Sequence, residues 1–287
     1  MKKLLMLLWL PVAMNLSAQE RITPTSEQIE RFPRTTLNVV LPNENILLES
    51  ALKEAMENKW KITPLKFIDK AEFEANIGDA NRSFLLFAGG SFQENPEEKS
   101  FVYTFLNLLM GGGESLNKLP EFLLLPVSCD GQSIDKSLLF MDAFVDIMQR
   151  HIRSIQKNPK LAKQRLDAFY NKNIERLTDR YLLLEKDDIT YTVTDEEKAL
   201  LFNGRLSVVE DSDIEKAVTA KAKNQIVGLT LYPRVGSPKD TWCYNLLIAA
   251  DTHELIYFKQ HKVNRKKGQG FLKEELKRFG IYLRKSK

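Results

Sequence analysis

Histidine and cysteine are scarce in this sequence, and their scarcity limits the catalytic chemistry that can be read from it. The chain of 287 residues contains three histidines and two cysteines. Hydrolysis through an activated serine or cysteine needs a base next to the nucleophile. His151, His253 and His261 accompany no recognisable nucleophile motif, and the pattern Gly-x-Ser-x-Gly is absent. The sequence therefore argues against a serine or cysteine hydrolase whose motif is continuous in the chain.

Phosphate-binding loops are lacking as well. Gly89 and Gly90, and the glycines at 111–113, follow apolar segments, where such loops occur. However, a polar loop and another apolar segment come next, whereas a phosphate loop opens directly into a helix N-terminus. These glycines therefore predict turns or bulges, and no nucleotide or other cofactor is expected.

Candidate metal ligands gather in one place, at Asp251, His253, Glu254 and His261. The first three of these also form the polar turn that a hairpin needs between its two arms. No second cluster of ligands supports a metal site. We therefore interpret the segment as a turn and expect no metal.

Beyond the N-terminus, no apolar run is long enough to span a bilayer, which needs about 20 residues. At the N-terminus, Lys2 and Lys3 precede the apolar run 4–14, and the small residues Ser17 and Ala18 follow. This order is typical of a secretory signal peptide, with cleavage after Ala18, and the run is too short for a membrane anchor. The sequence predicts a periplasmic or secreted protein without a transmembrane segment after cleavage.

Export would permit a disulfide between Cys129 and Cys243, the cysteines of the mature chain. Both lie in or beside apolar segments that read as strands. A bridge requires the two α-carbons to lie within about 7 Å of each other. A disulfide and two buried free thiols therefore both remain open.

The distribution of apolar residues predicts an α/β fold with mixed sheets. Residues 241–263 read as a strand hairpin, and residues 134–155 carry a helical stripe of apolar positions. A second helix from about Lys160 would complete a long helical hairpin. Near the C-terminus, we expect a helix from Phe271 to Arg278, ended by Gly280, and a short final strand.

The same order of predicted strands and helices occurs before and after the helical hairpin. Residues 67–69 and 72–74 match residues 208–210 and 213–215 in apolar or acidic character, at a constant offset of 141. Any α/β protein can yield such matches by chance. We interpret them as two similar β-α-β-α-β-β-β halves. The predicted organisation is a signal peptide at 1–18, an N-terminal half at 19–132, a helical hairpin at 133–178 and a C-terminal half with a basic tail at 179–287.

The C-terminal segment is strongly basic. From residue 259 to residue 287, eleven lysines and arginines face two glutamates, a balance of +9. This surface could bind nucleic acid, anionic lipid headgroups or an acidic protein patch, and export makes nucleic acid the least expected. It could also be a solvated helix face, with Leu272, Leu276 and Phe279 turned inward. The residues that would contact an anionic partner are Lys259, Lys262, Arg265, Lys266, Lys267, Lys273, Lys277 and Arg278.

Two resemblances add to this interpretation. The strand 243–249, the turn 251–254 and the arm 255–263 resemble the C-terminal signature of exported bacterial proteins of unknown function. The order of strands and helices also resembles the small α/β modules of periplasmic and outer-membrane assembly factors, such as the TolB N-terminal domain. These resemblances imply a fold and an exported location, and no functional residue carries over from them.

These observations favour a non-catalytic binding or assembly module of the cell envelope. It would hold a protein or peptide in a groove between its halves or along a sheet edge. The competing hypothesis is an envelope hydrolase whose active site is assembled only in the fold, for instance from Asp130, Asp251 and Glu254.

Overall fold

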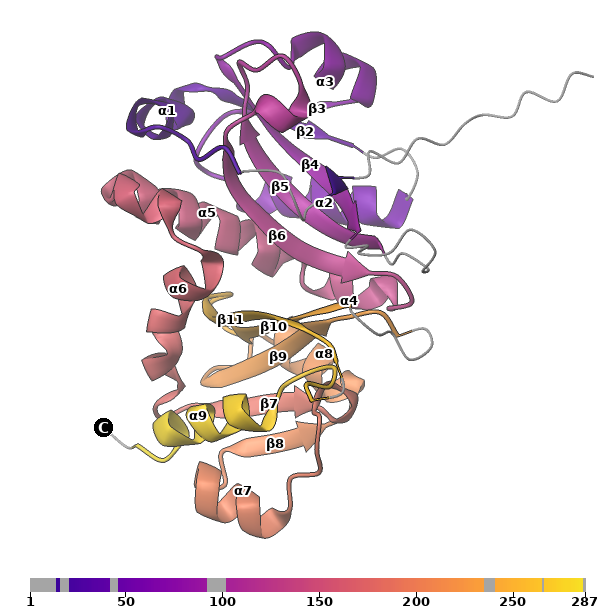
Figure 1. Cartoon of the computed structure of the whole chain (residues 1–287), viewed down its shortest axis with the longest axis vertical. Helices are drawn as coiled ribbons and strands as arrows, with labels where there is room; N and C mark the ends of the chain where they lie inside the picture. The colour runs from indigo at the N-terminus through magenta and orange to yellow at the C-terminus, as the bar shows by residue number, and fades with distance from the viewer. Residues whose placement is uncertain are drawn as a thin grey trace, which may run out of the picture.

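The computed structural model describes residues 14–15, 21–41, 46–91, 102–234, 241–264 and 266–285. These residues form an α/β fold with two similar mixed sheets, as the sequence predicts (Figure 1). The predicted signal peptide and its cleavage after Ala18 lie outside the described residues, apart from the two-residue strand β1 (Met14–Asn15) beside β4. In the part of the chain that is described, none of the helices combines the length and apolarity that a membrane span requires.

The N-terminal sheet has the strand order β3-β2-β4-β5-β6. β2 is parallel to both of its neighbours, while β4, β5 and β6 form an antiparallel meander. Its strands are β2 (Thr36–Val40), β3 (Leu65–Ile68), β4 (Arg82–Ser91), β5 (Val102–Met110) and β6 (Glu121–Cys129). The helical elements of this half are α1 (Ser26–Arg31), η1 (Phe32–Arg34), α2 (Ile46–Lys59), α3 (Lys70–Asn76) and η2 (Leu116–Lys118).

The C-terminal sheet repeats this arrangement with the order β8-β7-β9-β10-β11. β7 is parallel to both neighbours, and β9, β10 and β11 form the meander. Its elements are β7 (Tyr181–Glu185), η5 (Lys186–Asp188), α7 (Asp195–Phe202), β8 (Leu206–Val209), α8 (Asp211–Thr219), β9 (Gln225–Leu231), β10 (Trp242–Ala249), β11 (Leu255–Lys262) and α9 (Lys273–Leu283). Strand for strand, the two halves agree in order and direction.

The residues at constant offset occupy equivalent places in the two halves. β3 and β8 are the outer strands of their sheets at the parallel end. Asp69 and Glu210 occupy the N-caps of the helices that follow them, α3 and α8. Asp69 fulfils this role through its side chain, which accepts a hydrogen bond from the Glu72 amide at 2.8 Å. The similar halves are confirmed, while a common origin of the halves stays a prediction.

The helical connection is more broken than the apolar stripe predicts. Its first arm consists of α4 (Ile134–Leu139) and α5 (Met141–Lys157), which meet at Phe140, where φ is −94° and ψ is 5°. Its second arm contains only five α-helical residues, in α6 (Leu166–Tyr170), between the 3₁₀ turns η3 (Pro159–Lys163) and η4 (Asn171–Leu177). We therefore correct the second helix to a series of short turns.

These turns run along the outer edge of β11 and satisfy its free backbone groups. The Asn171 side-chain carbonyl accepts a hydrogen bond from the Phe258 amide at 2.8 Å. The Asn173 side-chain amide donates to the Leu255 carbonyl at 3.1 Å. Because unpaired strand edges invite association with other strands, this covering leaves β11 unavailable for strand addition.

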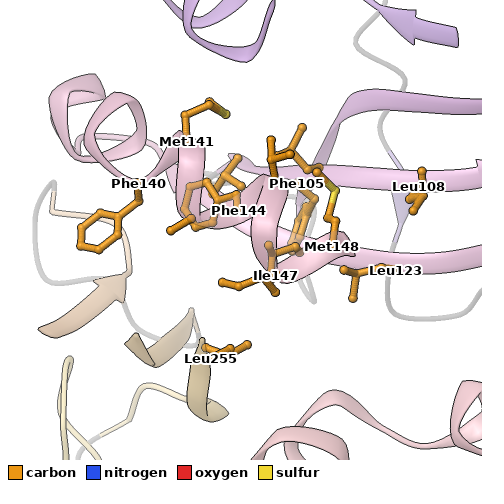
Figure 2. Packing of buried hydrophobic residues seen from close by; sticks show 14 of the residues in the cluster. Phe105, Leu108, Leu123, Phe140, Met141, Phe144, Ile147, Met148 and Leu255 are labelled. Atoms are coloured by element: carbon orange, nitrogen blue, oxygen red, sulfur yellow. The ribbon is translucent and has the colours of Figure 1, made fainter. Parts of the chain in front are cut away.

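One hydrophobic core joins the two halves. It contains buried side chains from α2, α5 and the strands of the N-terminal sheet, together with residues of α8, β9, β10 and β11. Figure 2 shows Phe144, Ile147 and Met148 of α5 among side chains of β5 and β6, with Leu255 of β11 nearby. A second core lies on the opposite face of the C-terminal sheet, under α7 and α9. The halves are therefore packed as one body.

α9 extends past the glycine that was expected to end it. The helix runs to Leu283, and the predicted final strand at 281–284 is wrong. A Cβ at Gly280 would lie 2.5 Å from the Leu201 carbonyl oxygen of α7. The glycine therefore lets two helices approach closely and does not act as a helix terminator.

Candidate functional site

The described basic residues of the predicted set lie in α9, in the loop before it and in β11, and α9 lies on the outer side of the C-terminal sheet (Figure 1). As predicted, Leu272, Leu276 and Phe279 are buried under the helix. Lys273, Lys277 and Arg278 are exposed, as are Lys266 and Lys267 in the loop before the helix. These five residues are called the α9 basic face below.

The other predicted cations differ from this group. Lys259 lies 3.4 Å from Glu275 and 3.9 Å from Glu274, so its charge is balanced within the fold. Lys262 is half-buried, and Arg265 lies outside the described residues. The structure therefore removes Lys259 from the predicted anion-binding set and retains the α9 basic face.

Within the described ranges, no carboxylate lies within ion-pair distance of the α9 basic face. Two of its cations rest on aromatic rings instead. Lys273 Nζ lies 4.8 Å from the centre of the Tyr191 ring, and Arg278 Cζ lies 5.9 Å from that of Tyr257. Such contacts orient a cation without neutralising its charge. The face therefore presents positive charge to solvent, with the exposed Glu274 between Lys273 and Lys277 as a carboxylate of the same helix.

A second polar site, which the sequence analysis missed, lies where the halves meet. We call it the interface charge cluster; it consists of Lys136 of α4, Glu185, Asp188 and Arg234. Lys136 pairs with Glu185 and lies 3.8 Å from Asp188, whose other oxygen is 2.8 Å from Arg234. The cluster lies at the carboxyl ends of the parallel strands β7 and β9, whose connections leave in opposite directions. Ligands of open α/β sheets commonly bind at such a position.

Asp188 dominates the electrostatics of the interface charge cluster. Its side chain is 1% exposed, and burial raises the pKa of its carboxyl to about 6 despite the nearby Lys136 ammonium. Because the cluster joins α4 to the C-terminal half and its central carboxylate, Asp188, is buried, we interpret it as an ionic latch between the halves.

No sequence signal marks this cluster. Its cations, Lys136 and Arg234, are 98 positions apart in the chain, and neither belongs to a motif. The one usable hint is the acidic run after β7, where Glu185, Asp187 and Asp188 end a buried strand. Only the packing of α4 against the C-terminal half brings a lysine to that run.

Each histidine occupies a separate structural environment. His151 Nδ1 lies 3.1 Å from the Tyr170 hydroxyl, and complete burial lowers its pKa to about 3. His253 Nδ1 lies 2.8 Å from Asp146 Oδ2 of α5. His261 Nε2 lies 2.9 Å from the Gly268 carbonyl oxygen, and burial lowers its pKa. All three are buried, so each contributes to packing or hydrogen bonding in the fold.

The acidic residues of the hydrolase hypothesis are not assembled into one site. Asp130 stands just after β6 and accepts a hydrogen bond from the Val102 amide at 3.0 Å. Asp251 and Glu254 lie in the turn between β10 and β11, where each pairs with an arginine, at 3.4 Å and 2.6 Å. Among the described residues, no group of three or more His, Cys, Asp and Glu side chains is arranged to hold a metal ion.

Cys129 and Cys243 are buried free thiols in the structure. Cys243 Sγ is hydrogen-bonded to the Asn245 side chain and the Gly270 amide, on the side of β10 that α9 covers. Cys129 belongs to the core shared by the two halves, with Tyr244 on the other side of β10. Burial raises the pKa of both thiols well above the usual range, which makes them poor nucleophiles.

Comparison of the chain with protein-family models, curated proteins and solved structures finds no match.

Proposed function

We propose that the protein is an exported, non-catalytic binding or assembly module of the cell envelope that engages an anionic partner through its α9 basic face. The single observation that carries this proposal is the exposure of these five cations without a carboxylate partner among the described residues. Some charges elsewhere in the fold are paired, for example Lys59 with Asp142 at 3.1 Å and Arg205 with Asp179 at 3.2 Å.

The internal architecture supports a rigid presentation of this face. The inner side of α9 packs on the C-terminal sheet, and Glu275 fixes its first turn by accepting a hydrogen bond from the Leu272 amide at 3.0 Å. Glu275 also accepts from the Asn245 side chain of β10 at 3.1 Å. A preorganised set of cations loses little side-chain freedom on binding, which favours affinity.

The test is binding of the purified mature protein to poly-L-glutamate, a soluble polyanion without apolar groups. We expect binding that weakens steeply between about 0.05 M and about 0.5 M salt, because exposed charges are screened over a Debye length. The double variant Lys273→Glu/Lys277→Glu should lose most of this binding. Lys61→Glu, which alters an exposed lysine of the N-terminal half, is the matched control and should bind as the native chain does.

A polyanion affinity that does not depend on salt, or that survives the double variant unchanged, would reject the proposal. A complementary measurement is cross-linking in intact cells from a photoreactive side chain at Lys277. Recovery of one defined envelope partner would support the binding module. Turnover of a cell-wall or glycan substrate by the pure protein would instead favour the hydrolase.

A further inference from the structure

An apolar side chain interrupts the cations on the outer side of α9. Lys273, Lys277, Ile281 and Lys285 follow one another at four-residue spacing along the helix and just beyond it. Residues at this spacing lie on one side of a helix, one turn apart. Ile281 is 50% exposed in this stripe, between two exposed lysines.

A second exposed aliphatic side chain comes from α7, the helix that packs against α9. α7 and α9 touch at Gly280, where a Cβ would lie 2.5 Å from the Leu201 carbonyl oxygen. Leu200, the neighbour of Leu201, is 74% exposed. Leu200 and Ile281 therefore flank one helix contact, next to the cations of α9.

Tyrosine rings complete the composition of this surface. Lys273 Nζ lies over Tyr191, and Lys285 Nζ lies 5.0 Å from the centre of the Tyr282 ring. Lysine, tyrosine and exposed aliphatic side chains together are typical of surfaces that sit at the boundary between lipid headgroups and acyl chains. An acidic protein patch would be bound by the cations alone and would leave Leu200 and Ile281 unexplained.

We propose that the partner of the α9 basic face is the surface of an anionic lipid bilayer, on which the protein docks peripherally. This inference rests on the proposed function and names its partner. The cations bind the headgroups, and each lysine at the surface contributes about fivefold in affinity. Leu200 and Ile281 enter the headgroup region, while the buried side of α9 stays packed on the C-terminal sheet.

Exposed carboxylates oppose this docking, among them Glu274 between Lys273 and Lys277 on α9 and Glu196 on α7. Glu196 is exposed on α7, one helical turn before Leu200. A negative charge at this place repels anionic headgroups, so Glu196→Gln should bind anionic vesicles more tightly, by roughly threefold to fivefold.

The experiment is co-sedimentation of the mature protein with vesicles of phosphatidylcholine, with and without phosphatidylglycerol. We expect binding only when phosphatidylglycerol is present. The variant Leu200→Ser/Ile281→Ser should lose roughly tenfold in vesicle affinity and keep its affinity for poly-L-glutamate. Lys273→Glu/Lys277→Glu should lose both, and Val102→Ser, which removes an exposed apolar side chain from the N-terminal half, should lose neither.

The outcomes separate this inference from the proposed function. A chain that binds poly-L-glutamate but not anionic vesicles has an acidic macromolecule as its partner, which overturns the lipid proposal alone. Equal binding to vesicles with and without phosphatidylglycerol, or full vesicle binding by the Leu200→Ser/Ile281→Ser variant, would also overturn it. A chain that binds neither probe lacks the proposed function altogether.

Discussion

The Tyr103 hydroxyl donates a hydrogen bond to the Trp242 carbonyl oxygen at 2.7 Å and accepts one from the Trp242 amide at 3.0 Å. Tyr103 belongs to β5 and Trp242 begins β10, so one side chain joins the two sheets. Its ring also packs edge-on against Tyr244, with centroids 5.6 Å apart. This contact and the interface charge cluster hold the halves in one orientation.

Loss of the Tyr103 hydroxyl should therefore destabilise the whole fold. Tyr103→Phe leaves both backbone groups of Trp242 without this partner in a largely buried place, at a cost of about 1–3 kcal/mol in the free energy of unfolding. Urea denaturation followed by tryptophan fluorescence measures the loss. Tyr244→Phe is the control, because that hydroxyl accepts one bond, at 3.2 Å, from the Gln260 side chain, and it should cost less. Equal losses would contradict the bridging role.

Asp188 should make stability depend on pH in an unusual direction. Burial raises the pKa of its carboxyl from an ordinary 3.8 to about 6, so the folded state binds this proton more tightly than the unfolded state does. The contribution of this carboxyl to the free energy of unfolding is therefore largest below about pH 4 and falls by about 3 kcal/mol as the pH rises to about 6. Asp188→Asn should remove that part of the slope.

The measurement is the unfolding free energy of native and variant chains at several pH values between about 4 and about 7. The difference between the two curves isolates Asp188 from the other titrating groups. Asp187→Asn, which removes an exposed carboxylate that faces the same arginine at 3.6 Å, should keep the native slope. Parallel curves for Asp188→Asn and the native chain would show that Asp188 is not the responsible group.

His253 should act on stability through both its ring and its backbone. Its φ of 55° lies in the left-handed region, and its ring is bonded to Asp146. His253→Ala loses the hydrogen bond to Asp146 and replaces a residue type that is enriched at positive φ with one that is not, which should cost about 2–4 kcal/mol. His253→Asn should cost less because asparagine tolerates this conformation. Thermal unfolding of both variants tests the order, and a more stable alanine variant would refute it.

Gly280 should tolerate no side chain, although it lies inside a helix. Replacing glycine by alanine in a helix interior normally stabilises by about 1 kcal/mol. Here the new Cβ would lie 2.5 Å from a backbone oxygen of α7, so Gly280→Ala should destabilise by about 1–3 kcal/mol. Gly89→Ala is the matched control, since its nearest contact would be Val102 Cγ1 at 3.6 Å. Chemical denaturation measures the change in the free energy of unfolding, and the loss should be larger for Gly280→Ala than for Gly89→Ala.

The sequence predicted the elements whose signal is local. Thr194 and Glu197 form the capping box that begins α7, with bonds of 3.2 Å and 3.3 Å. β3 follows Pro64, which has no amide hydrogen to donate, and the strand lies at the end of its sheet. The inward and outward sides of α9 also follow directly from the spacing of its leucines and lysines. Each of these features depends on residues within a few positions of one another.

The predictions that failed depended on distant contacts. Gly280 reads as a helix terminator until α7 is placed against it, because a local pattern cannot show a backbone oxygen 2.5 Å away. The apolar residues between 161 and 177 have helical spacing. The segment nevertheless packs along the edge of β11, where Asn171 and Asn173 form hydrogen bonds with the strand backbone. Tertiary hydrogen bonds outweighed the local preference for a continuous helix.

By itself, the sequence determined the α/β class, the similarity of the two halves and the basic character of the C-terminal segment, since periodicity and charge are written along the chain. Only the tertiary structure decided that Lys259 is neutralised by Glu275, and that Lys136 meets Asp188 at the seam between the halves. The reason is physical: the state of a charge depends on its burial and on the nearest opposite charge, and both are set by residues that are far apart in the chain.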